Sequence, residues 1–130
     1  MPAKGSELVE GELTERIIGA AIEVHRSLGP GLLESAYEEC MCHELRLRGI
    51  PFSRQQALDI MYKGSAVGSA CKLDLLVDER VIVELKAVTE VAELHRAQLL
   101  TYLRLSGKPV GLLINFNVPV LKDGITRVVQ

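Results

Sequence analysis

One segment, KLDLLVDERVIVELK at positions 72–86, most constrains what this chain can fold into. Its apolar residues form two short runs, 73–77 and 81–85, on either side of a polar break at 78–80. Such a pattern is typical of two strands joined by a tight turn. Because the apolar residues of these runs are mostly consecutive rather than alternating, we expect a β-hairpin that is covered on both faces.

Three charged residues interrupt this apolar hairpin. If residues 78–80 form the loop, pairing outward places Asp74 directly opposite Glu84, and Lys86 shares their face of the sheet. Two carboxylates about 4 Å apart repel each other by roughly 4 kcal/mol at an effective dielectric constant near 20. A positive charge must therefore lie close to them. Lys86 supplies one, and a divalent cation between the carboxylate oxygens would supply another.

Carboxylates beside a lysine are suited to metal-assisted hydrolysis of phosphodiesters. A bound metal polarises a phosphoryl oxygen and lowers the pKa of a bound water, and an ammonium group positions that water or balances developing charge. The simpler alternative is a solvated sheet face with surface ion pairs, which contribute little to stability. The apolar neighbours of Asp74 and Glu84 count against this alternative, because charges inside covered strands need partners.

The composition indicates one compact domain. With 130 residues, 48 % of them hydrophobic, the chain is long enough to bury a core without disulfides, and we expect a flexible segment at 1–12 and one domain at 13–130. The net charge of −2 argues against a polycation that coats nucleic acid. Three cysteines fit no disulfide framework, and neither a membrane span nor a signal peptide is evident, so we expect a cytoplasmic protein without membrane contact. The soft ligands in CMCH at 40–43 point in different directions on a helix, which favours packing over a zinc site.

Hydrophobic periodicity along the rest of the chain predicts an α/β order of elements. The expected helices span 14–28, with Thr14 as the N-cap, 32–48 and 89–106. The expected strands, besides the hairpin, span 52–62, 66–77 and 110–116, followed by a closing hairpin of 118–121 and 125–129. Because a helix links the strand at 81–85 to the strand at 110–116, we expect these two to pair in parallel through a right-handed crossover.

This order, with Asp74 followed by Glu84-Leu85-Lys86, resembles the core of the PD-(D/E)XK nuclease superfamily over almost the whole chain. More narrowly, GLLESAY at 31–37 matches the motif that names the GxxExxY protein family, a bacterial and archaeal group assigned to that superfamily. The resemblance implies a restriction-endonuclease-like α/β core, with a mixed sheet flanked by helices and a C-terminal β-hairpin.

The resemblance also implies roles for individual residues. Glu34, Asp74 and Glu84 would be the acidic metal ligands, and the Leu85 carbonyl would be a backbone ligand. Lys86 would hold or activate the attacking water.

Three further residues are expected to border the site. By the resemblance, Gln98 and Tyr102 would contact Lys86, water or the substrate phosphate; their spacing of four makes them neighbours on one helical face. The spacing of Glu34 and Tyr37 also places both on one face, so we expect Tyr37 to share the substrate pocket.

The leading interpretation is therefore a nuclease that uses Mg²⁺ or Mn²⁺ and acts on DNA. A homo-oligomer is a further expectation, because a small catalytic core often needs a second copy to grip a duplex. The main alternative is a catalytically silent module of the same fold for nucleic-acid binding or protein assembly. A third is that the carboxylates hold a metal for a structural or redox purpose; an iron or zinc site assisted by His95, which is close in sequence to Gln98, is one form of it.

Overall fold

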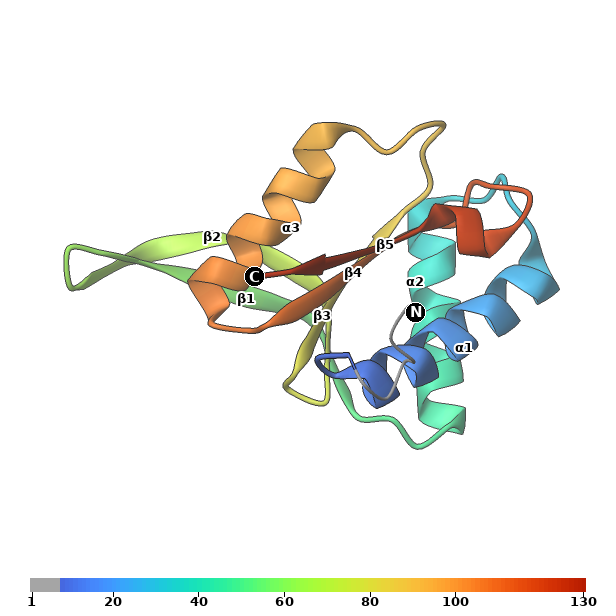
Figure 1. Ribbon diagram of the computed structural model, residues 1–130, viewed down its shortest axis with the longest axis horizontal. Helices are drawn as coiled ribbons and strands as arrows, with labels where there is room; N and C mark the ends of the chain where they lie inside the picture. The colour runs from blue at the N-terminus through green and yellow to red at the C-terminus, as the bar shows by residue number, and fades with distance from the viewer. Residues whose placement is uncertain (1–7) are drawn as a thin grey trace.

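The computed structural model describes residues 8–130. Its elements, in chain order, are α1 (Gly11–Leu28), α2 (Glu34–Leu47), β1 (Phe52–Tyr62), β2 (Ser65–Val77), β3 (Val81–Lys86), α3 (Glu93–Ser106), β4 (Val110–Asn115), the 3-10 helix η2 (Leu121–Gly124) and β5 (Ile125–Val129). The five strands form one sheet in the order β1-β2-β3-β4-β5, and helices lie on both sides of it (Figure 1). The predicted α/β class, with a mixed sheet and a C-terminal hairpin, is confirmed.

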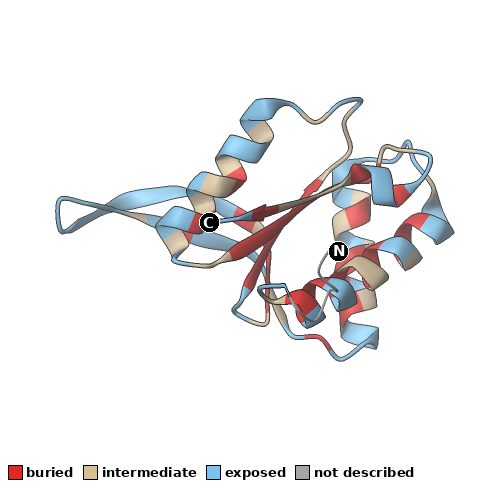
Figure 2. Ribbon diagram, in the orientation of Figure 1, coloured by how far each residue is buried: buried red, intermediate tan, exposed pale blue. Residues whose placement is uncertain are grey.

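The two faces of the sheet carry separate cores. Helices α1 and α2 pack on one face and α3 packs on the other (Figure 1). Along β3 the side chains alternate, so Val81, Val83 and Leu85 face α1 and α2, whereas Ile82 faces α3. Buried residues are concentrated on the central strands, as Figure 2 shows.

The central hairpin forms as predicted. Val77 pairs with Val81 across the three-residue turn, and the β2–β3 ladder is antiparallel. Asp78 and Glu79 both have positive φ, which a tight reversal of the chain requires. The parallel pairing of β3 with β4 is also confirmed, and Glu84 lies opposite Leu113 in that register.

Close contact between α3 and the sheet depends on Gly111 in β4. A Cβ at this position would lie 2.8 Å from Leu99 Cδ1 and 3.2 Å from the carbonyl oxygen of Ile82. The absence of a side chain therefore lets Leu99 on α3 rest directly on the strand.

The first helix begins earlier than predicted, at Gly11 rather than Thr14. The prediction of Thr14 as the N-cap was wrong: its hydroxyl is buried and donates to the Gly11 carbonyl within the first turn. Glu10, the residue before the helix, pairs with Arg80 in the hairpin turn. Of the predicted flexible segment, residues 1–7 lie outside the described part of the chain.

The other helices are shorter than their periodicity suggests. α2 begins at Glu34 rather than residue 32, and Leu33 is exposed. α3 begins at Glu93 rather than 89, and its buried residues are Leu99 and Leu103. Leu94, expected on the buried stripe, is 65 % exposed. None of the described helices is long and apolar enough to span a membrane.

The C-terminal hairpin consists of β4 and β5, which pair antiparallel from Val110 with Val129 to Ile114 with Ile125. The predicted strand at 118–121 is not formed; the chain turns through η2 instead. Gly124 at the end of η2 packs against the Asn115 carbonyl so closely that a side chain would not fit. This contact folds the connection back onto the end of β4.

The far end of the β1–β2 hairpin projects from the body of the protein (Figure 1). Every residue from 61 to 70 is exposed, including the apolar Met61, Tyr62 and Val67 (Figure 2). The β1–β2 register shifts twice on the way to the tip, after Leu58 and after Ile60. We call residues 59–70 the β1–β2 arm.

Candidate functional site

Two carboxylates replace the backbone ladder where β2 and β3 separate. The backbone ladder ends toward the site at the pair of Leu75 with Val83. Beyond it, the Asp74 N–H donates to Glu84 Oε1 at 3.2 Å, and the Leu85 N–H donates to Asp74 Oδ2 at 2.8 Å. Each carboxylate therefore accepts a backbone hydrogen bond from the neighbouring strand, which holds the two side chains next to each other.

Glu84 is the more buried member of this pair, with 8 % of its surface exposed. Burial, followed by the nearby Asp74 carboxylate, raises the pKa of Glu84 to about 8, although the Asp74 N–H and the Lys86 charge partly oppose the rise. Without a cation, Glu84 is therefore largely protonated at neutral pH. A raised carboxyl pKa beside a second carboxylate is a typical feature of functional sites.

Lys86 and Glu34 complete the charged group. Lys86 is the last residue of β3 and is half-buried; on the strand it is two residues beyond Glu84, hence on the same face. Glu34 is the first residue of α2. Partial burial raises the pKa of Glu34, the Asp74 and Glu38 carboxylates add to the rise, and Lys86 and His95 oppose it. The structure therefore brings Glu34 within electrostatic range of Asp74 and Lys86.

The arrangement fits a hard divalent cation bound by two carboxylates. Within residues 8–130, no group of three or more His, Cys, Asp or Glu side chains is placed to hold a metal ion. The three-carboxylate ligand set implied by the resemblance is thus not gathered into a metal-binding group, although Glu34 is within electrostatic range of Asp74. Asp74 and Glu84 still match Mg²⁺, which is commonly bound by one or two carboxylates together with water.

The structure does not support a metal site that includes His95. Its Nδ1 accepts the Ala92 N–H at 3.1 Å, so the ring caps the start of α3. The cysteines at 40 and 42 are free, and Cys42 is buried in the core.

Tyr37 is a core residue rather than a substrate contact. Its side chain has no exposed surface, and its ring stacks on Phe116 with centroids 4.5 Å apart. The hydroxyl donates to the Gly29 carbonyl at 2.6 Å and accepts the Leu32 N–H at 3.2 Å. Tyr37 therefore fixes the loop that leads into α2, and the substrate-binding role expected for it is not supported.

Tyr102 lies on the carboxylate side of the sheet, as expected. Burial raises its pKa to about 12, and the Cys71 thiol and the carboxylates of Glu84 and Asp74 contribute to the rise. Gln98 is half-buried one helical turn before it. Leu85 is buried in β3, and its N–H is bound to Asp74.

Sequence reasoning missed Gln55 on β1, which contacts Asp74, and Glu38 on α2, which contacts Gln55. Gln55 Nε2 donates to Glu38 Oε1 at 2.7 Å and to Asp74 Oδ1 at 3.4 Å. Glu38 is four residues after Glu34 on α2, so both are on one face of that helix. The only signal was the polar segment RQQ at 54–56 inside an expected strand.

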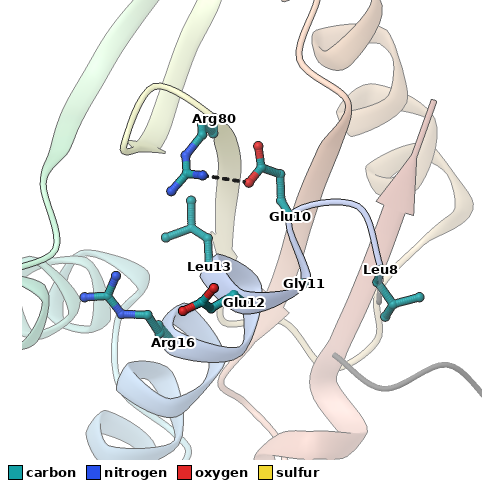
Figure 3. A pocket seen from close by; sticks show the side chains of 7 residues that line it. All are labelled: Leu8, Glu10, Gly11, Glu12, Leu13, Arg16 and Arg80. Atoms are coloured by element: carbon teal, nitrogen blue, oxygen red, sulfur yellow. Dashed lines mark hydrogen bonds and ion pairs between the residues drawn. The ribbon is translucent and has the colours of Figure 1, made fainter. Parts of the chain in front are cut away.

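A hollow of about 330 Å³ lies elsewhere, beside the start of α1 (Figure 3). It is lined by Leu8, Glu10, Gly11, Glu12, Leu13, Arg16 and Arg80. Arg80 already pairs with Glu10 at 3.0 Å and with Asp78 at 2.8 Å, which gives it a structural role. Asp74, Glu84 and Lys86 do not line this hollow, so it is separate from the candidate site.

Comparison with known proteins identifies the family of this chain. A family model for the PD-(D/E)XK nuclease superfamily matches residues 11–128. Neither the curated proteins nor the solved structures gave a match. The matched region extends from the first turn of α1 into β5 and includes the carboxylate pair and Lys86. This chain therefore belongs to the PD-(D/E)XK nuclease superfamily.

Proposed function

We propose that this protein is a nuclease dependent on Mg²⁺ or Mn²⁺ that hydrolyses phosphodiester bonds in DNA, and that it belongs to the GxxExxY group of the superfamily. The observation that carries the proposal is the Asp74–Glu84 pair, held by reciprocal backbone hydrogen bonds and followed by Lys86. Together with membership of a nuclease superfamily, this pair favours hydrolytic chemistry over a purely structural role.

In this proposal the carboxylates of Asp74 and Glu84 hold the cation, with the Leu85 carbonyl as a further oxygen ligand. The bound cation would polarise the phosphate and lower the pKa of a water. The cost of ionising buried Glu84 is offset only when that positive charge is present, because burial and Asp74 raise its pKa to about 8. Lys86 holds or activates the attacking water or balances the charge that develops on the phosphate.

Three residues are assigned to the border of the site. Glu34 at the start of α2 is close enough to feel the charges of Asp74 and Lys86, and we place it near the attacking water or a second cation. Gln98 and Tyr102 on α3 are assigned to phosphate or water contacts. The position of Tyr102 near both carboxylates supports this assignment.

The test is cleavage of labelled single-stranded and duplex DNA and RNA with Mg²⁺, Mn²⁺ or EDTA. Asp74→Asn and Lys86→Ala should each reduce metal-dependent cleavage about 100-fold or more, because each removes a group required in the transition state. Asp59→Asn on β1 and Lys72→Ala on β2 are the controls, since both residues are exposed and their variants should retain wild-type rates. Circular dichroism verifies that each variant is folded.

A silent nuclease-fold module is the second candidate. It is favoured by the absence, among residues 8–130, of a group of three or more potential ligands placed to hold a metal. Folded wild-type protein that binds DNA in a gel-shift assay but yields no products with either metal would support this candidate and contradict the nuclease proposal. Light scattering in the same samples tests the homo-oligomer that we expect to accompany duplex binding.

A further inference from the structure

Gln55 departs from strand geometry in the middle of β1. Its φ is +52°, a left-handed conformation that residues other than glycine rarely adopt outside turns. The β1–β2 register pairs Arg54 with Leu75 and Gln56 with Leu73, but Gln55, opposite Asp74, is not paired. A local strain of this kind persists only where the surroundings hold it, and it is often found at functional sites.

The distorted backbone places the Gln55 amide between two carboxylates. Nε2 donates to Glu38 Oε1 at 2.7 Å and, more weakly, to Asp74 Oδ1 at 3.4 Å. The other Asp74 oxygen accepts the Leu85 N–H, so each oxygen of this carboxylate has a donor. Glu38 is held in turn by Arg54, whose Nε lies 2.7 Å from its Oε2.

We propose that Gln55 is a positioning residue that orients Asp74 for cation binding and ties it to α2, which carries Glu34. This inference rests on the proposed metal-dependent nuclease function. An amide suits the task because it is neutral: it donates to two carboxylates and does not repel a cation, as a lysine or arginine at this position would. Donors that bind a metal-binding side chain, without binding the metal themselves, orient that side chain and change metal affinity when removed.

The first test is calorimetric titration of the full chain with Mn²⁺. Gln55→Gly removes the amide, yet glycine accepts positive φ without strain, so the variant should fold and keep or increase its melting temperature. We expect its Mn²⁺ affinity to fall about tenfold. Gln56→Ala is the matched control: this neighbouring glutamine is exposed and paired in the ladder, and its loss should leave the affinity unchanged.

A second pair of variants separates the hydrogen bond from the ion pairs of Arg54. Glu38 and Glu39 each bind this arginine, but only Glu38 also binds Gln55. Glu38→Ala should therefore weaken Mn²⁺ binding, by less than Gln55→Gly does, whereas Glu39→Ala should not. In cleavage assays, Gln55→Gly should raise the Mn²⁺ concentration for half-maximal rate, with wild-type kcat restored at saturating metal.

The outcomes distinguish this proposal from the function on which it rests. Wild-type protein that binds Mn²⁺ and cleaves DNA, with Gln55→Gly equal to it in Mn²⁺ affinity, would overturn the role of Gln55 alone. A changed melting temperature with unchanged Mn²⁺ affinity would likewise reduce Gln55 to a structural role. Wild-type protein that neither binds Mn²⁺ nor cleaves would overturn the nuclease function and this inference with it.

Discussion

The two faces of the sheet are built for different tasks. On the α1–α2 face, twenty buried residues form one continuous core among the described residues, whereas the α3 face has eight. The face with the smaller core is the one that carries Glu84 and Lys86 on β3. Stability therefore comes mainly from one face, and the other has room for charged groups.

This division has a physical reason. A carboxylate pair within a complete apolar core would have no solvent access and would stay protonated. On the α3 side, Glu84 is nearly buried, but Asp74 and Lys86 are half-buried and accessible to water and substrate. The smaller core on the α3 face therefore leaves the two adjacent carboxylates accessible to water.

The largest expected effect is a loss of stability, and it tests the core between the sheet and helices α1 and α2. Tyr37→Ala should lower the free energy of unfolding by about 4 kcal/mol, because it removes a fully buried ring that stacks on Phe116. Leu103→Ala on the α3 face should cost about 2–3 kcal/mol. Urea unfolding measures both. A larger cost for Leu103→Ala would contradict the assignment of stability mainly to the α1–α2 face.

The second largest expected effect is a pH dependence of stability, and it tests the charged residues on the α3 face. The Glu84 pKa in the folded protein, about 8, lies above its value of 4.5 in an unfolded chain. Its stabilising contribution is therefore fully present below about pH 4.5 and is lost as the pH rises through 8. Between pH 6 and 9, metal-free wild type should lose about 2–3 kcal/mol from this group, whereas Glu84→Gln should not. Urea unfolding in EDTA across this pH range measures the free energy of unfolding of both proteins. The same pH dependence in wild type and Glu84→Gln would refute the raised pKa of Glu84.

The smallest effect tests the contact between α3 and the sheet. Gly111→Ala should cost about 1–2 kcal/mol, because the new methyl group would meet Leu99 and the Ile82 carbonyl. Adding Leu99→Val makes room for the methyl group, so the double variant should lose less stability than the sum of the single variants. Thermal unfolding of the three proteins measures this coupling. Strictly additive effects would show that α3 is not held at this point.

The sequence was most informative where the signal is local. The polar break at 78–80 between two apolar runs defined the hairpin, and the length of the loop fixed its register. That register alone predicts that Asp74 and Glu84 lie together. The parallel pairing of β3 with β4 followed from the helix between them.

Other features depended on contacts distant in sequence. Helical spacing placed Glu34 and Tyr37 on one face, but it could not show that Tyr37 points inward to Phe116. At the early start of α1, Glu10 pairs with Arg80, which is 70 residues away in the sequence. The role of Gln55 depends on a positive φ that no residue pattern indicates.

The β1–β2 arm should unfold locally, before the rest of the domain does. Residues 61–70 are all exposed, so the arm is held by its own ladder rather than by a core. Such a segment unfolds and re-forms without disturbing the rest of the domain. Its amide hydrogens should exchange with deuterium long before those of β3 and β4, and a protease should cut first near Lys63 at its tip. Evolution can therefore change the length and sequence of this arm, and with them what it touches, at little risk to the fold.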